Sequence, residues 1–417
     1  MRILFLTQVL PYPLDAGPKV RAYYVLKHLA SRHEITLVSF VRPTDSPDSL
    51  AHIQGLCSRL VTVPIQRSRL RDAASMGLSL VKQEPFLILR DRVAELRRTL
   101  TELLEAKRFD AIHADQLWMA TYALQAAQAV AHAGWRPRLV LDQHNAVFLI
   151  PQRMADGARN PLVRYALKHE AHLMARYETR ICQQFDHVVW VTKEDLQAVS
   201  GLQHGSRKLQ TANQNTVIPI CVDPSSIPIY SHDSEVLFRN PSPAILFIGG
   251  MHWPPNAEGV AWFLQHVFPL VRAQIPDIQF HIVGKSPPAE LGSQAGVVAP
   301  GYVEDAEFYW QRSQVFIVPL RAAGGMRVKI LDAWARGVPV ISTTIGAEGI
   351  SYKAGDHLLI ADTPQDFSQA IIRVFYDDQL WQHLSRNGRK MVEENYDWRR
   401  TYKLFDPIYP AGSNLPH

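Results

Sequence analysis

The sequence predicts an α/β protein with two Rossmann-like, doubly wound parallel-sheet domains. Short apolar runs alternate with longer helical stretches, a pattern typical of parallel sheets. A second set of such units begins near Ala244, after segment 219–243, whose five prolines are typical of a linker. Because parallel sheets bind ligands at the carboxyl ends of their strands, we expect the facing edges of the domains to form a cleft.

The first predicted domain comprises residues 1–223. Its helices show apolar residues at helical spacing, and Pro161 fits the start of the last one because a first-turn N–H has no helical partner. The strands are expected at 3–7, 35–40, 60–64, 111–114, 139–142 and 187–191, and the helices at 20–30, 89–106 and 161–184.

The second predicted domain comprises residues 224–395. Its strands are expected at 244–249, 279–283, 314–319 and 338–342, and its helices at 257–275 and 328–336. The remaining segment, 396–417, is rich in aromatic residues. We expect it to cross back to the first domain; a helix that caps its own domain is nearly as strong an alternative.

Composition excludes several protein classes. With 417 residues, 47% of them hydrophobic and 20% charged, the chain is neither disordered nor fibrous. Its apolar runs are too short for a membrane span or a signal peptide. The three cysteines are far apart, so a disulfide framework is not expected and the predicted location is the cytoplasm.

Common cofactor and metal motifs are absent from the sequence. It contains no G-x-G-x-x-G, Walker A, H-E-x-x-H or G-x-S-x-G pattern, and no D-x-D pair that could clamp a metal-bound nucleotide. Its histidines are scattered rather than set at ligand spacing. We therefore expect neither a metal ion nor a bound cofactor.

The segment 319–332 carries the strongest candidate site. Gly324 and Gly325 lie between a predicted buried strand and a helix, and two cations, Arg327 and Lys329, follow in the first turn. Free backbone N–H groups, the helix dipole and these positive charges together suit a diphosphate. Asp332, further along the helix, could accept hydrogen bonds from ribose hydroxyls.

Two residues in the first domain are weaker candidates. Gly17 lies in a Pro/Gly loop before a helix, where an anion could approach the backbone, although such a loop is more often only a turn. His144 follows the strand 139–142 and could carry a proton near neutral pH. His113, at the end of another predicted strand, is a rival to it.

Motifs along nearly the whole chain resemble the family 4 glycosyltransferases of GT-B fold. In the first half these are residues 3–7, 33–38, 109–113, 188–195 and 217–223, and in the second half 245–250, 280–284, 301–305 and 324–339. The resemblance implies a retaining enzyme that uses a nucleotide sugar without a bound metal. GT-B epimerases share the fold, so the fold alone does not decide the activity.

The resemblance also implies roles for single residues. His144 is similar to the active-site histidine near the sugar, and Asp332 to the second glutamate of the E-x7-E motif, which holds the ribose. The other implied donor contacts are Gly17, Gly325 and Met326 at the diphosphate and Val303 at the base, and Gly250 and Gly324 also belong to the expected donor site.

Two departures from the family pattern concern charged groups. The first glutamate of the motif is replaced by Gly324, and the Arg/Lys pair expected after Gly249 is missing. Arg327 and Lys329 could replace these charges, and an Arg-x-Lys subset of the family is similar. We therefore include both cations among the catalytic residues.

Charge is distributed unevenly between the predicted domains. The net charge of +5 divides into +8 for residues 1–223 and −3 for 224–417. The basic half is the expected acceptor domain, and a basic stretch there could rest on anionic lipid at the inner face of the membrane. An ordinary solvated helix is an equal alternative. The basic residues are Arg67, Arg69, Arg71, Lys82, Arg90, Arg92, Arg97 and Arg98.

The sequence thus predicts a glycosyltransferase with a UDP-, GDP- or ADP-sugar donor and a saccharide or lipid-linked acceptor. A role in polysaccharide or glycoconjugate biosynthesis is expected. A GT-B sugar-nucleotide epimerase or hydrolase and a non-catalytic nucleotide-sugar-binding homologue are the alternatives. Nucleic acid is not expected as a partner, because no motif supports it and the second half is acidic.

Overall fold

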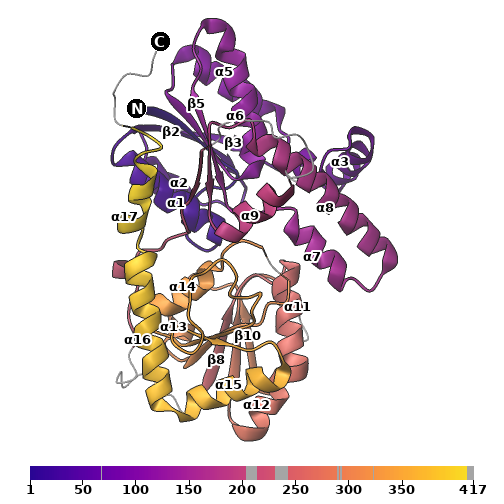
Figure 1. The fold of residues 1–417 in the computed structure, drawn as a ribbon, viewed down its shortest axis with the longest axis vertical. Coiled ribbons are helices and arrows are strands. Elements are labelled where there is room, and N and C mark those ends of the chain that lie inside the picture. The colour runs from indigo at the N-terminus through magenta and orange to yellow at the C-terminus, as the bar shows by residue number, and fades with distance from the viewer. Residues whose placement is uncertain are drawn as a thin grey trace. The chain divides into compact units, whose positions relative to one another are not determined.

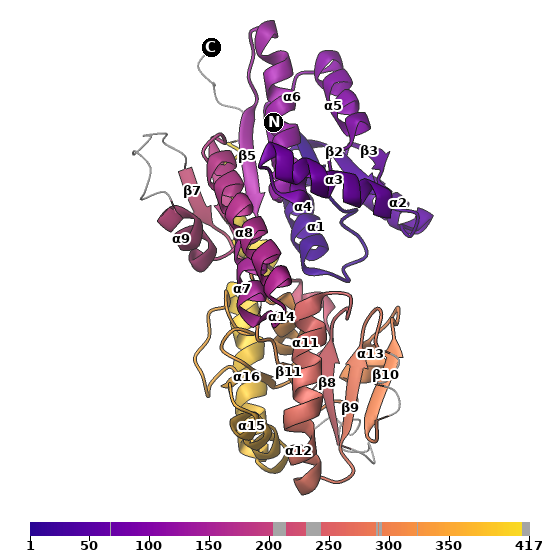
Figure 2. The same ribbon diagram turned by 90° about the vertical axis from the view of Figure 1, so that its right-hand side faces the viewer.

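The computed structural model contains two compact units, each with its own parallel sheet (Figure 1 and Figure 2). Unit 1 comprises Met1–Cys221 and Trp398–His417, and unit 2 comprises Val222–Asp397. The prediction of two parallel α/β sheets is confirmed. Arg67 and residues 231–242 of the predicted linker lie outside the described residues. The structure describes residues 1–66, 68–202, 214–230, 243–288, 291, 294–322 and 324–410.

The unit 1 sheet has seven strands in the order β3-β2-β1-β4-β5-β6-β7, and every neighbouring pair is parallel. Strands buried on both faces need continuous apolar runs, which is why the sequence marks them clearly. The edge strand β7 has the polar sequence Gln-Asn-Thr-Val and was not predicted. The strands are β1 Arg2–Thr7, β2 Glu34–Val41, β3 Arg59–Pro64, β4 Ala111–Asp115, β5 Arg138–Gln143, β6 His187–Trp190 and β7 Gln214–Val217.

The helices of unit 1 contradict one predicted element. A single helix over 89–106 was expected, but α4 ends at Leu89 and α5 begins at Ala94. The Tyr122 hydroxyl interrupts it, because it donates to the carbonyl of Asp91 and accepts from the N–H of Val93. The helices are α1 Gly17–Ala30, α2 Pro47–Gln54, α3 Arg69–Lys82, α4 Phe86–Leu89, α5 Ala94–Ala106, α6 Leu117–Val130, α7 Leu149–Gly157, α8 Pro161–Cys182 and α9 Lys193–Gly201.

The C-terminal segment packs within unit 1, where α17 (Trp398–Thr401) lies beside α1 (Figure 1). The Tyr402 hydroxyl accepts a hydrogen bond from the N–H of Cys221, 3.1 Å away. Tyr409 is hydrogen-bonded to Nδ1 of His113 at 2.6 Å. The aromatic residues of this segment are therefore part of the core of unit 1.

The unit 2 sheet has six strands in the order β10-β9-β8-β11-β12-β13, also paired in parallel. The strands are β8 Ala244–Ile248, β9 Gln279–Val283, β10 Val297–Gly301, β11 Val315–Val318, β12 Val340–Ser342 and β13 Leu359–Ile360. The helices are α11 Pro254–Trp262, α12 Phe268–Gln274, α13 Glu307–Trp310, α14 Val328–Ala335, α15 Pro364–Tyr376 and α16 Asp378–Asn395.

One predicted helix of unit 2 is interrupted. The sequence indicated a helix over 257–275, but a π-helical turn, Phe263–Val267, separates α11 from α12. Pro269 has no N–H to donate to the carbonyl four residues earlier, so the α-helical hydrogen-bond pattern is broken before it, and Pro269 lies in the first turn of α12.

Each sheet has a point where the strand order reverses. In unit 1 this point lies between β1 and β4, and in unit 2 between β8 and β11. The loops that follow such a strand pair diverge to opposite faces and leave a crevice that suits a ligand. The loops after these strands, and after their neighbours, carry the candidate residues.

Candidate functional site

His144 lies just beyond β5 in unit 1 and is bonded to Asp115 at the end of β4. Its Nε2 atom is 2.9 Å from Oδ1 of Asp115. Since a carboxylate accepts hydrogen bonds, this contact places the hydrogen on Nε2. His144 is only 8% exposed, and its Nδ1 has no hydrogen-bond partner among the described residues. This buried nitrogen is therefore available as a hydrogen-bond acceptor at the end of the sheet.

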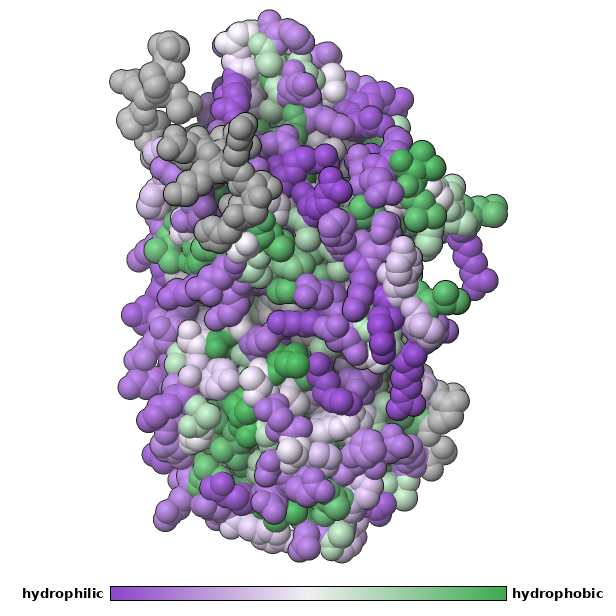
Figure 3. Space-filling model, turned by 45° about the vertical axis from the view of Figure 1, so that its right-hand side comes forward, coloured by the Kyte–Doolittle hydropathy of each residue, from purple (hydrophilic) through white to green (hydrophobic). Residues whose placement is uncertain are grey.

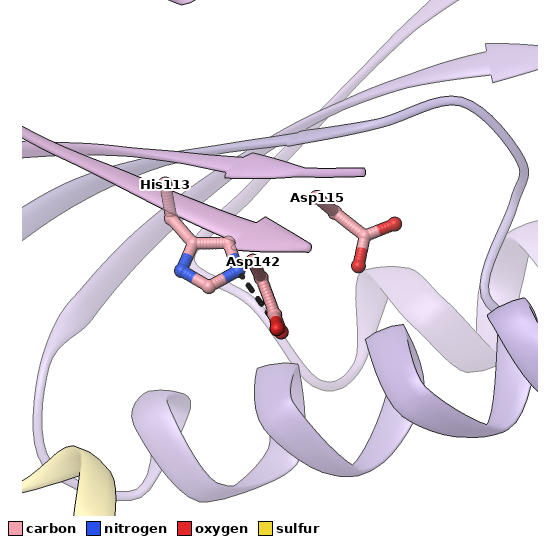
Figure 4. Close-up of side chains that lie close together, drawn as sticks. All are labelled: His113, Asp115 and Asp142. Atoms are coloured by element: carbon pink, nitrogen blue, oxygen red, sulfur yellow. Dashed lines mark ion pairs between the residues drawn. The ribbon is translucent and has the colours of Figure 1, made fainter. Parts of the chain in front are cut away.

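Beneath His144, three buried side chains lie close together at the strand ends: His113, Asp115 and Asp142 (Figure 4). Each offers a possible metal-ligand atom, and these atoms lie within 4.8 Å of one another. Arg21, however, donates two hydrogen bonds of 2.9 Å to Asp142. Because its fixed positive charge would repel a cation there, we interpret the group as an ion-pair network.

Burial and neighbouring charges together shift the pKa values of His113 and Asp142. Burial lowers the pKa of His113 to about 4, so this ring is neutral near pH 7. Burial alone would raise the pKa of Asp142, but the adjacent Arg21 guanidinium holds it below its usual value. His113 also bonds to Tyr409 and stacks on Phe5. These contacts favour a structural role for His113, the rival of His144.

The loop that carries His144 is held by two buried carboxyl groups. Glu178 of α8 accepts hydrogen bonds from the N–H groups of Val147, at 3.0 Å, and Phe148, at 3.3 Å. Asp195 of α9 accepts the N–H of Ala146 at 2.8 Å. Burial raises the pKa of Glu178 to about 8, although the two N–H donors oppose the shift. The loop backbone is thus fixed by side chains from two helices.

Gly17, the other candidate in unit 1, is the first residue of α1, after the loop that follows β1. The preceding Ala16 has no side chain that could cap the helix, and the first turn contains no acidic residue. Lys19 forms an ion pair of 2.9 Å with Asp15 across this turn. Gly17 and His144 both follow strands of this sheet at their carboxyl ends.

In unit 2, the turns after neighbouring strands meet backbone to backbone. Gly284 follows β9, and a Cβ atom there would overlap the carbonyl of Gly249, which follows β8. The N–H of Met251 donates to the carbonyl of Lys285 at 2.8 Å, and that of Gly284 to Gly301 at 2.9 Å. A side chain is therefore excluded at Gly284, whereas at Gly250 the position of a Cβ atom is taken by the ring of His252, which lies against this turn.

Lys329 reaches this turn from α14. Its Nζ atom is 3.2 Å from Oδ1 of Asn256 and 4.4 Å from the ring centroid of Phe247. A Cβ atom at Gly249 would be only 2.8 Å from Nζ. Burial, with a contribution from Arg327, lowers the pKa of Lys329 to about 7. The cation predicted to replace the missing Arg/Lys pair thus lies beside the turn where that pair was expected.

The glycine-rich turn after β11 has an unusual backbone. Gly325 has a φ of 70°, which few side chains tolerate, and Met326 is buried. Arg327 is the N-cap residue of α14, and its guanidinium donates to the carbonyl of Gly324 at 2.5 Å. Gly324 to Lys329 thus form one continuous turn and helix start.

Asp332 and the Val303 segment are linked through Arg336. This arginine forms an ion pair of 3.4 Å with Asp332 and a second with Glu307 of α13. Val303 is half-buried in the preceding loop. The Asp332 side chain is 44% exposed and so remains open to a polar ligand. Among the residues that the structure describes, no hydrogen bond or ion pair is recorded between Lys329 and Asp332 or Val303, so we treat the candidates of unit 2 as two neighbouring groups.

Sequence reasoning missed several residues that support the candidates. Asp115 could have been found, because β4 ends in His-x-Asp and an Asp-x-His sequence spans the end of β5. Asp115 and Asp142 are partners in the strand register. Nothing in the sequence indicated that Asn256 contacts Lys329, because the two residues are 73 positions apart.

Two glycosyltransferase family models together match most of the chain. Residues 16–212 match the model described as a glycosyl transferase 4-like domain, and residues 242–377 match glycosyl transferases group 1. The chain belongs to the family 4-like glycosyltransferases. The predicted family membership is therefore confirmed.

Curated members of this family match parts of the chain. An uncharacterized 44.6 kDa protein in the cps region of Klebsiella pneumoniae is 28% identical over 45% of this chain and 50% of its own length. A phosphatidyl-myo-inositol mannosyltransferase of Mycolicibacterium smegmatis is 28% identical over 40% of this chain and 46% of its own length. The chain spans about half the length of these relatives.

Solved structures confirm the GT-B fold for this family member. HepE from Anabaena, in complex with UDP, superposes with a TM-score of 0.65 and 15% sequence identity. The match covers 98% of this chain and 99% of HepE. At this identity the likeness concerns the fold.

Proposed function

We propose that the chain is a retaining glycosyltransferase that moves a sugar from a nucleotide donor to a saccharide or lipid-linked acceptor. The observation that carries this proposal is the position of Lys329 beside the glycine turn after β8. An ammonium group at the switch point of a parallel sheet suits a diphosphate.

The proposed chemistry depends on the charge of the leaving group. As the glycosidic bond breaks, negative charge accumulates on the nucleoside diphosphate. Arg327, Lys329 and the backbone of residues 324–326 would stabilise this charge without a metal ion, because they are fixed before the reaction begins. Electrostatic stabilisation of this kind lowers the barrier to departure of the diphosphate.

The remaining roles follow from the family resemblance. In unit 2, Gly250 would contact the diphosphate, the backbone near Val303 the base, and Asp332 the ribose. In unit 1, the family pattern assigns Gly17 to the diphosphate and His144 to the transferred sugar. The buried Nδ1 of His144, which has no partner within the described part of unit 1, supports a contact with a polar ligand there.

A thermal-shift panel of UDP-, GDP- and ADP-sugars tests donor binding. At 100 times its Kd, the correct donor adds about 2.7 kcal/mol to the free energy of unfolding. For a unit of this size, we expect the Tm to rise by about 5–10 °C. Inorganic phosphate at the same concentration is the control, and no shift with any of the donors would contradict the proposal.

Turnover assays separate the proposed transferase from the alternatives. We expect product only when donor and acceptor are both present, with the anomeric configuration of the donor retained. Conversion of donor alone would indicate an epimerase or a hydrolase. Donor binding without turnover in any acceptor mixture, together with no effect of His144→Ala, would indicate a non-catalytic homologue.

We further propose that unit 1 contacts an anionic membrane through a surface formed by α3 and the start of α8. Exposed apolar residues concentrate there, and Figure 3 shows hydrophobic residues on the projecting α3. Leu70 is 86% exposed and Val81 is 82% exposed. The other members are Met76, Leu78, Leu80, Leu162, Val163 and Tyr165.

Basic side chains accompany this apolar surface. Arg69, Arg71 and Lys82 are exposed on α3, and Arg164 and Lys168 on α8. Apolar insertion combined with attraction to anionic headgroups is the usual basis of peripheral membrane binding. In the part of the chain that the structure describes, no helix could span a membrane. The name of the Mycolicibacterium relative specifies a lipid, phosphatidyl-myo-inositol, which supports a lipid-linked acceptor.

Vesicle co-sedimentation tests the membrane surface. We expect stronger binding to vesicles that contain phosphatidylglycerol than to neutral vesicles. The double variant Leu70→Glu and Val81→Glu should bind at least tenfold more weakly, because each change removes an apolar contact and adds a repelled charge. The matched control is Leu270→Glu with Tyr376→Glu, two exposed positions of unit 2. Equal binding to both vesicle types would favour an ordinary solvated helix.

A further inference from the structure

The Asn256 side chain connects the two loops at the switch point of unit 2. It lies on α11, is only 7% exposed, and is 73 positions from Lys329 in the chain. Its Nδ2 atom donates to the carbonyl of Gly250 at 3.0 Å, and its Oδ1 atom accepts from Nζ of Lys329 at 3.2 Å. One amide thus joins the turn after β8 to the helix after β11.

These two contacts determine the orientation of the amide. A carbonyl can only accept and an ammonium can only donate, so Nδ2 must face Gly250 and Oδ1 must face Lys329. No side chain would fit at Gly249, which lies beside the Asn256 amide and the Lys329 ammonium. A Cβ atom at Gly249 would be 2.8 Å from both Nδ2 of Asn256 and Nζ of Lys329. The glycine, the amide and the ammonium therefore pack as one group.

We propose that Asn256 is a positioning residue that directs the Lys329 ammonium toward the turn Gly249–Gly250. This inference rests on the proposed function, in which Lys329 meets the donor diphosphate. Without the Oδ1 acceptor, the flexible lysine side chain could adopt other rotamers and the ammonium would leave the turn. An error of about 1 Å in such a group can reduce a rate by about 100-fold.

The neutral amide has a chemical advantage over a carboxylate here. The groups that face Nζ are the Phe247 ring from β8, Asn256 from α11 and the Arg327 charge from the start of α14. An amide orients the ammonium and leaves its charge available to a diphosphate. A carboxylate at the same place would form an ion pair with Lys329 and compete with the donor.

The first test does not depend on turnover. Acetylation of Lys329 by acetic anhydride, followed by mass spectrometry across a pH series, reports the fraction of uncharged amine. In Asn256→Asp the new negative charge would favour the ammonium, so the midpoint should move upward by at least about one pH unit. Lys353, which pairs with Asp356 elsewhere in unit 2, should keep its midpoint. An unchanged Lys329 midpoint would overturn the contact on which the proposal rests.

The second test uses steady-state kinetics on the full chain. Asn256→Ala should lower kcat about 100-fold. Asn256→Asp should raise the KM for the donor and should shift the pH dependence of this KM to higher pH. The control Glu258→Gln, on the exposed face of the same helix, should retain wild-type kinetics. A wild-type kcat for a folded Asn256→Ala would overturn the positioning role. If neither the wild type nor any variant turned over a donor, the proposed function would be wrong. The acetylation experiment would still test the contact between Asn256 and Lys329.

Discussion

Replacing Lys329 with alanine is expected to lower kcat by about 100- to 1,000-fold, a loss of about 2.7–4 kcal/mol of transition-state stabilisation. The reason is the position of the Lys329 ammonium in the candidate donor site. The ammonium lies against the glycine turn after β8, where the family's usual Arg/Lys pair is missing. Arg327 donates to the carbonyl of Gly324, so it cannot take over this position without giving up that bond.

The measurement is steady-state turnover with the donor identified by thermal shift. Lys353→Ala is the matched control, because Lys353 is a lysine of the same unit that is 77% exposed and pairs with Asp356. Equal thermal unfolding curves for the variants would exclude misfolding as the cause of the loss. Unchanged donor affinity and turnover in Lys329→Ala would show that the replacement hypothesis is wrong.

Donor affinity should also depend on pH through Lys329. Because its pKa is about 7 without a ligand, the amine is largely uncharged at pH 8, and binding a diphosphate then requires proton uptake. Affinity should fall as pH rises above 7, by up to about tenfold per unit, until the pKa of the bound state is reached. Calorimetry in buffers of different ionisation enthalpy measures the proton uptake. Lys329→Arg should abolish this dependence, since arginine stays charged.

The fold was largely predictable because its strands are buried on both faces. Ile3 to Leu6, for example, are fully buried, so their sequence is a continuous apolar run. At the sheet edges this condition fails, and the edge strands β7, β10 and β13 were not predicted. The edge strand β7 is polar, and the break between α4 and α5 depends on Tyr122, which is distant in sequence. Such tertiary hydrogen bonds leave no local signal.

The candidate site was predictable only as far as local motifs reach. Gly324 to Lys329 could be singled out because glycines and cations are adjacent in sequence. The partners of these residues could not, since parallel sheets bring distant segments together. Asn256 is one example, whereas Asp115, the partner of His144, did leave a sequence signal at the ends of β4 and β5. The Arg/Lys pair that is missing after Gly249 led to the hypothesis that Arg327 and Lys329 replace it, and Nζ of Lys329 does lie against Gly249.

Replacing Arg21 with alanine is expected to destabilise unit 1 by about 3–5 kcal/mol, the usual effect of leaving a buried charge without its partner. Arg21 and Asp142 are both fully buried, and two hydrogen bonds of 2.9 Å join them. Arg21 also donates to the carbonyl of Pro219 at 2.8 Å and lies 5.0 Å from the Tyr402 ring centroid. One side chain therefore ties α1 to β5, to the end of unit 1's first segment and to the returning C-terminal segment.

Two further variants separate the buried charge from the other contacts of Arg21. Arg32→Ala, a change at a partly exposed arginine near the same helix, should cost less than about 1 kcal/mol. The double variant Arg21→Met with Asp142→Leu removes both charges and should recover a large part of the loss. Urea unfolding, followed by a probe in unit 1, measures each value. A loss below 1 kcal/mol for Arg21→Ala would contradict the interpretation, because an ionised Asp142 cannot remain buried and unpaired at so little cost.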